Sequence, residues 1–97
     1  MEADMKRMRL RAEVFAAASE FNRALGDYYD AVRRQASAEE VGRFAADARR
    51  KGEGFVATLD ELIAHLEGSE PDDLRADEMG RLRQFRELAA REMDLTR

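Results

Sequence analysis

The 97-residue sequence contains no cysteine and no tryptophan, and it has one proline and one histidine. Without cysteine the chain forms neither a disulfide nor a zinc site with thiolate ligands, so packing alone must hold the fold. A single histidine offers no second imidazole to a metal, and no serine stands in the context of an activated nucleophile. The sequence therefore predicts no catalytic residue, no metal site and no cofactor.

Long hydrophobic runs are also missing. The longest apolar run, Val14 to Ala18, is too short to cross a membrane, and acidic residues near the N-terminus disfavour a mitochondrial transit peptide. We therefore predict a cytoplasmic protein without a membrane partner. Fifteen of the seventeen basic residues are arginine, and alanine is abundant. This composition is typical of GC-rich coding sequences, so we expect a bacterial origin.

The charge is acidic overall and uneven along the chain. The net charge of −4 argues against a general binder of nucleic acids. Residues 1–51 carry 11 basic and 9 acidic side chains, whereas residues 52–97 carry 6 and 12. Such opposed halves favour antiparallel or head-to-tail association of copies, but ordinary solvated helix faces give the same pattern. The best candidate basic patch consists of Arg33, Arg34, Arg43, Arg49, Arg50 and Lys51. It lacks interleaved aromatic residues, so we do not expect nucleic-acid binding.

Little valine, isoleucine and threonine and much alanine, leucine, glutamate and arginine favour helices over strands. A chain of this length fits one domain, residues 1–97. We predict a first helix over about 4–35, because its apolar residues recur at alternating steps of four and three, as in coiled coils. These residues are Val14, Ala18, Phe21, Leu25, Tyr28 and Val32. The opposite side, with Glu13, Glu20, Asp27 and Arg34, is expected to face solvent.

A second helix is predicted over about 38–67. Ser37 followed by Glu40 forms a capping box that marks its start. Gly52 and Gly54 are its weak point, since each glycine costs about 1 kcal/mol relative to alanine in a helix interior. The apolar periodicity continues across both glycines, which favours one continuous, kinked helix. The alternative is a break there, giving four helices.

A third helix is predicted over about 71–95. Gly68 suits the left-handed position that ends a helix, and Ser69 with Asp72 forms a capping pattern around Pro71. The apolar positions are less regular than in the first two helices, because Glu78 and Glu92 fall near them. We therefore predict an all-α antiparallel bundle of three long amphipathic helices, with the third covering the others less tightly.

The broad apolar face of the first helix is the candidate interface. Rows of residues spaced by seven flank its central apolar stripe, and together the face exceeds what two neighbouring helices cover. The candidate interface residues are Phe15, Ala17, Asn22, Ala24, Tyr28, Tyr29 and Ala31. The sequence thus predicts a non-enzymatic module for protein–protein contact, which either forms a homodimer or binds an amphipathic helix of a partner.

Two alternatives involve the polar residues. A small helical enzyme or ligand-binding bundle would hold an anionic ligand with arginines such as Arg9, Arg11, Arg49 or Arg50, because guanidinium groups bind carboxylates in pairs. It requires at least two arginine side chains to point into one pocket. His65 and Glu61 are spaced to share a metal but form only half a site. We interpret His65 as a structural residue that meets free carbonyls near the end of the second helix.

Overall fold

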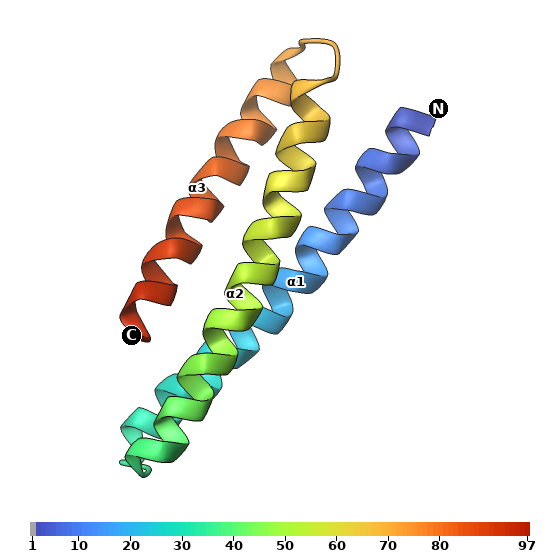
Figure 1. Ribbon diagram of the computed structural model, residues 1–97. Helices are drawn as coiled ribbons and strands as arrows, with labels where there is room; N and C mark the ends of the chain where they lie inside the picture. Colours follow the sequence, from blue (N-terminus) through green and yellow to red (C-terminus); the bar gives the residue numbers. More distant parts are fainter. Residues whose placement is uncertain (1) are drawn as a thin grey trace.

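The computed structural model describes residues 2–97 and contains three α-helices. Helix α1 spans Glu2–Arg33, α2 spans Ala38–Glu67 and α3 spans Asp73–Leu95. Each helix runs antiparallel to the one before it, so α1 and α3 run in the same direction (Figure 1). The predicted all-α fold of three antiparallel helices is confirmed. The molecule is elongated, with extents of 51 × 20 × 15 Å.

The turn between α1 and α2 is built by two caps. Ser37 is the N-cap of α2, and its hydroxyl accepts a hydrogen bond from the backbone N–H of Glu40 at 3.1 Å, as predicted. The Glu40 carboxylate accepts from Arg34 at 2.7 Å, and this bond lowers the pKa of Glu40. At the end of α1, the N–H of Ala36 donates to the carbonyl of Ala31 and Gln35 adopts a positive φ of 57°. This is a Schellman ending, which stops α1 two residues before the predicted Gln35.

The turn between α2 and α3 differs from the prediction in two respects. Gly68 has a φ of −83° and is right-handed, because its N–H continues the helical pattern by donating to Ala64. Helix α3 begins at Asp73 rather than at Pro71, and its N-cap is Asp72, which accepts from the N–H of Arg75. The Arg75 guanidinium and the Ser69 hydroxyl then donate to carbonyls in the last turn of α2 and just beyond it. Side chains therefore satisfy the carbonyls that a left-handed glycine would otherwise help to satisfy.

Helix α2 is continuous through both glycines, so the prediction of one helix is confirmed over the four-helix alternative. Gly52 is buried, whereas Gly54 is exposed. A Cβ atom at Gly52 would lie 2.6 Å from Sδ of Met93 in α3 and 2.8 Å from a ring carbon of Phe21 in α1. All three helices meet at this position because it carries no side chain.

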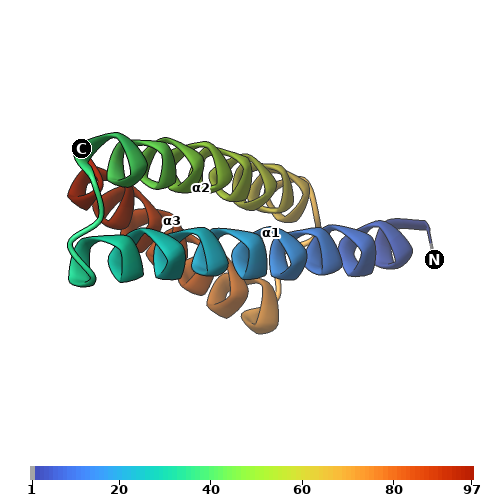
Figure 2. The same cartoon turned by 90° about the horizontal axis from the view of Figure 1, so that it is seen from below.

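In cross-section the three helices occupy three corners of a square, with α2 at the corner between α1 and α3. Helix α1 packs along α2, and α3 packs on another side of α2 (Figures 1 and 2). Within residues 2–97, no Cα atom of α1 lies within 8 Å of one in α3. In a closed three-helix bundle all pairs would be neighbours, since packed helices lie 8–10 Å apart between their axes. The backbones of α1 and α3 are thus separated like those of diagonal helices in a four-helix bundle, and no helix of residues 2–97 lies at the fourth corner.

The core lies where α1 and α3 face α2. Its largest fully buried side chains are Leu10 on α1 and Leu59, Leu62 and Leu66 on α2. The predicted apolar stripe of α1 fails at its last member, because Val32 is 48% exposed and Ala31 is buried instead. The end of α3 explains this difference. The Tyr28 hydroxyl donates to the carbonyl of Leu95, the last residue of α3, so only α2 covers α1 beyond that level.

Replacing each glycine of α2 by alanine tests the close approach of the helices. Gly52→Ala gains helix propensity of about 1 kcal/mol but must displace Met93 and Phe21, which costs about 1–3 kcal/mol. We expect a net loss of about 1 kcal/mol in the free energy of unfolding. Gly54→Ala, the matched control, meets no atom within 4 Å and should gain about 0.5–1 kcal/mol. Urea denaturation followed by circular dichroism measures both, and equal effects at the two positions would contradict the close approach.

Candidate functional site: an apolar groove between α1 and α3

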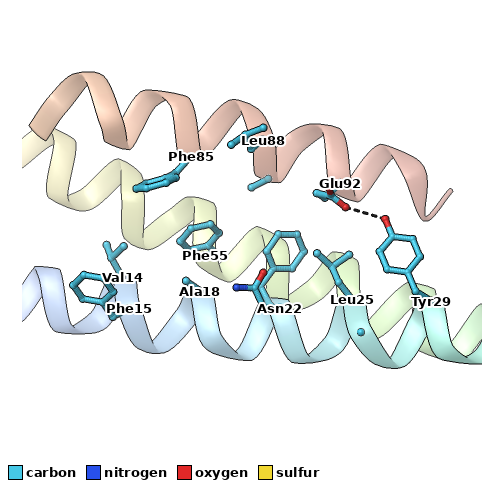
Figure 3. Close-up of a pocket in the computed structure, with 13 residues that line it drawn as sticks. Val14, Phe15, Ala18, Asn22, Leu25, Tyr29, Phe55, Phe85, Leu88 and Glu92 are labelled. Atoms are coloured by element: carbon cyan, nitrogen blue, oxygen red, sulfur yellow. Dashed lines mark hydrogen bonds between the residues drawn. The ribbon is translucent and has the colours of Figure 1, made fainter. Parts of the chain in front are cut away.

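An apolar groove of about 600 Å³ occupies the space between α1 and α3. The rings of Phe21 and Phe55 lie at its base with their centroids 5.9 Å apart. Phe15 on α1 and Phe85 and Leu88 on α3 form its sides (Figure 3). The remaining lining residues are Val14, Ala18, Asn22, Leu25, Gly26, Tyr29, Ala89 and Glu92. Most of this surface is hydrocarbon, as in a site that binds another apolar surface.

The large side chains at the sides of the groove are exposed to solvent. Phe15 is 74% exposed, Leu88 is 52% exposed and Phe85 is 47% exposed. Such residues contribute little to the core of the free chain but would bury substantial apolar area under a covering element. Burial of each removes apolar surface from water at about 25 cal/mol per Å². The groove therefore exposes apolar area that a covering element would remove from water.

A hydrogen bond closes one end of the groove. The Tyr29 hydroxyl on α1 donates to the Glu92 carboxylate on α3 at 2.8 Å (Figure 3). This bond raises the pKa of Tyr29 above its ordinary value of 10.0, with smaller effects from burial and from the negative charge of Glu92. The phenol therefore remains a protonated donor at neutral pH, and it ties α3 to α1 where the backbones do not touch.

An ion-pair cluster braces the other end. Glu78 on α3 is buried, and its carboxylate accepts from Nε of Arg11 at 2.7 Å and from Nε of Arg7 at 3.3 Å, both on α1. Its near-complete burial requires such compensation, because an unpaired buried carboxylate is strongly disfavoured. Arg81, one turn further along α3, lines the adjoining hollow with Arg11 and Phe85. The groove is thus an apolar segment between two polar cross-links.

Asn22 is the polar residue at the centre of the α1 side of the groove. It lies one heptad after Phe15 and one heptad before Tyr29, so the three residues form one row along the helix (Figure 3). It is exposed, and its side chain makes no hydrogen bond to any residue between 2 and 97. An exposed amide among aromatic residues can pair with a partner's polar group and fix the register of a helix contact.

The candidate interface residues divide into two rows on α1. Phe15, Asn22 and Tyr29 line the groove and are exposed. Ala24 and Ala31 are buried, and Ala17 packs against the core, so this row faces the interior of the chain. Tyr28 lies between the rows. Its hydroxyl donates to the carbonyl of Leu95, and its ring makes an edge-to-face contact with the ring of Tyr29. Phe85, Leu88 and Glu92 on α3 were not predicted as site residues, although Glu92 stood out as a charge near an apolar face.

Most of the predicted basic patch is engaged within the chain. Arg33 and Arg34 pair with Asp30, and Arg34 also pairs with Glu40. Arg50 pairs with Asp47, and Lys51 lies 3.8 Å from Glu20. Arg49 donates to the carbonyl of Thr96 at 2.7 Å, whereas Arg43 forms no ion pair in the described chain. These partners offset much of the positive charge of the six residues, so the positive potential at this surface is weaker than their number suggests.

The four arginines named for the ligand-binding alternative do not share one pocket, although Arg11 lines a hollow together with Arg7, Arg81 and Glu78. Arg9 is exposed on α1, and Arg11 is paired with Glu78. Arg49 donates to the carbonyl of Thr96 after the end of α3, and Arg50 pairs with Asp47. His65 lies in the last turn of α2, where Nε2 is 3.2 Å from the carbonyl of Ala3. Between residues 2 and 97, no three histidine, aspartate or glutamate side chains gather as metal ligands.

Comparison of the chain with protein-family models, with curated proteins and with solved structures finds no match. None of the three helices, over the part of the chain that the structure describes, combines the length and apolarity needed to span a bilayer.

The bond between Tyr29 and Glu92 can be tested by alkaline titration. The chain has two tyrosines and no tryptophan, so Tyr28→Phe leaves Tyr29 as the only source of tyrosinate absorbance. We expect its midpoint above 10, and Glu92→Gln should lower that midpoint. A raised pKa in the folded state means that this contribution to stability is present below pH 10 and is lost as the pH rises through the folded value. Identical midpoints for Tyr28→Phe and for the double variant Tyr28→Phe with Glu92→Gln would contradict the bond.

The Glu78 brace predicts a loss of stability on neutralisation. Glu78→Gln leaves Arg7 and Arg11 without their counter-ion. We expect the free energy of unfolding to fall by about 2 kcal/mol, because Glu78 is buried whereas its arginine partners are partly exposed. Asp60→Asn is the matched control, since Asp60 pairs with Arg86 in an exposed ion pair between α2 and α3. It should cost at most about 1 kcal/mol. Urea denaturation of both variants decides, and equal losses would refute a special role for Glu78.

Proposed function

We propose that the protein is a non-enzymatic interaction module whose groove between α1 and α3 receives an amphipathic helix. The observation that carries this proposal is the arrangement of the helices. The backbone of α2 packs against both neighbours, whereas α1 and α3 meet through side chains alone, and the vacant corner between them is lined by exposed aromatic and aliphatic side chains. A helix is the element that completes such an arrangement.

The chemistry of the groove favours a helix over a reactive or charged ligand. The polar side chains that line it are Asn22, Tyr29 and Glu92, and the last two already bind each other. No arginine lines the groove, so it offers no paired guanidinium groups to an anionic substrate. An apolar row at helical spacing suits a groove of this kind, because recognition of this type uses anchors at positions i, i+3 or i+4, and i+7.

The direction and length of the incoming helix follow from the fold. Helices α1 and α3 run in the same direction, so a fourth helix that continues the alternation runs antiparallel to both. Phe15 and Tyr29 mark the two ends of the groove on α1. Their 14-residue separation corresponds to about 21 Å of helix. The bound segment therefore needs about four turns and two to three apolar anchors.

Photo-crosslinking tests whether a helix enters the groove. Benzoylphenylalanine at Phe85 places a reactive ketone in the groove at a position that is 47% exposed, so the free chain should fold normally. We expect ultraviolet light to join the chain to a protein segment that mass spectrometry maps to an amphipathic helix. The experiment is done both with the purified chain and in the cells that naturally produce it.

The matched control places the same amino acid at Glu61, an exposed position of α2 that does not line the groove. A partner bound in the groove should give an adduct from position 85 and little from position 61. Equal yields from both positions, or crosslinks only to segments that do not form amphipathic helices, would disprove the proposal.

A further inference from the structure

We infer that the helix received by the groove is α1 of a second copy of this chain, lying antiparallel with the two-fold axis at Asn22. This inference rests on the proposed function and names the partner for the same groove. In the resulting dimer, each α1 occupies the vacant corner of the other copy. Six helices then form two overlapping four-helix bundles that share the two α1 helices.

The row of groove residues on α1 is self-complementary. Phe15 and Tyr29 each stand seven residues from Asn22, one on either side. Two antiparallel helices that cross at Asn22 therefore place Phe15 of each copy opposite Tyr29 of the other, and Asn22 opposite Asn22. Aromatic pairs gain stabilisation beyond their buried area, and two amides can each donate to and accept from the other. A symmetric interface requires this kind of self-matching surface.

The residues one turn from Asn22 permit close approach. The same antiparallel register places Ala18 of one copy opposite Gly26 of the other. Both line the groove, and a Cβ atom at Gly26 would have no atom within 4 Å in the free chain. Small residues on either side of the axis leave room for the larger aromatic pairs beyond them.

The ends of this contact bring like charges together, and each arginine there already pairs with a carboxylate of its own chain. In the antiparallel register Arg11 of one copy faces Arg33 of the other. Arg11 pairs with Glu78, and Arg33 lies 3.5 Å from Asp30 within its own chain. Each end of the contact therefore contains carboxylates as well as guanidinium groups, and repulsion at the ends is limited.

The exposed surface has the size that a dimer needs. The chain exposes 6791 Å², whereas a typical monomeric protein of its mass exposes about 5,700 Å². The excess of about 1,100 Å² comes from the elongated shape and the open groove. A standard interface removes about 800 Å² from each partner. Pairing along the groove would thus give a surface close to that of an ordinary folded protein.

Disulfide formation between single-cysteine variants tests the register, since the natural chain has no cysteine. Asn22→Cys should form a disulfide-linked dimer on mild oxidation, because position 22 meets itself at the axis. Ala18→Cys and Gly26→Cys should each crosslink poorly alone, as copies of one position lie about 12 Å apart along the helix. An equimolar mixture of the two should crosslink readily. Asp27→Cys, on the solvent side of α1, gives the rate of random collision.

Sedimentation equilibrium at micromolar concentration supplies the second measurement. We expect twice the mass of the chain, and Phe15→Glu should weaken the dimer about 100-fold or more, because two copies of a buried phenylalanine are lost. Leu74→Glu is the matched control. Leu74 is 75% exposed and Phe15 is 74% exposed, but Leu74 does not line this groove. The control should change the dissociation constant less than about threefold, and both variants should remain helical as monomers.

The outcomes separate this inference from the proposed function. A monomeric mass, or equal crosslinking of all single-cysteine variants, overturns the antiparallel dimer. If the purified chain is monomeric and the Phe85 photo-crosslink joins it to a helix of another protein, the groove still has its proposed function and only the identity of the partner is wrong. A monomer without any groove-specific adduct overturns both.

Discussion

The arrangement of this bundle depends on the close approach of three helices at Gly52. Because this position has no side chain, Phe21 from α1 and Met93 from α3 both reach the backbone of α2. Helix α2 is thereby the common support, and its continuous apolar side carries both neighbours. Helices α1 and α3 pack on different sides of α2, which keeps their backbones apart. The groove is the direct result of this separation.

Two polar cross-links join α1 to α3, one at each end of the groove. Glu78 receives Arg7 and Arg11 at one end, and Glu92 receives Tyr29 at the other. Each link joins residues more than 60 positions apart in the chain, and each uses a long side chain to cross a distance that packed aliphatic groups do not fill. Hydrophobic side chains of similar size would draw the helices together and cover the surface that the groove exposes.

Periodicity and capping chemistry predicted much of the fold. The alternating apolar steps placed α2 correctly and carried it through Gly52 and Gly54, because a loop would have interrupted the phase. The hydroxyl of Ser37 predicted the start of α2 for the same local reason. The predictions that failed depended on contacts from other parts of the chain. Gly68 stays right-handed because the side chains of Arg75 and Ser69 donate to the nearby carbonyls. The sequence does not show that the Arg75 side chain folds back onto the end of α2.

The candidate site was predictable on one side only. Phe15, Asn22 and Tyr29 follow from the heptad spacing of α1, but the same spacing also selected Ala24 and Ala31, which α2 covers. A periodic pattern shows which residues share a face and does not show which neighbour covers that face. The α3 side of the groove, with Phe85 and Leu88, depends on the rotation of α3 about its axis. That rotation buries Met79, Leu82 and Ala89 and brings Glu78 to Arg7 and Arg11. In the sequence, Glu78 looks like a defect in an apolar face.

The vacant corner also affects how firmly the chain is folded. A helix that binds only the folded form stabilises it in proportion to the logarithm of its concentration. Helix α3, which rests on α2 along one side and reaches α1 through side chains alone, would open more readily than the α1–α2 hairpin when the corner is empty. The abundance of the occupant would then set the lifetime of α3 on the bundle, and with it the resistance of the chain to proteolysis.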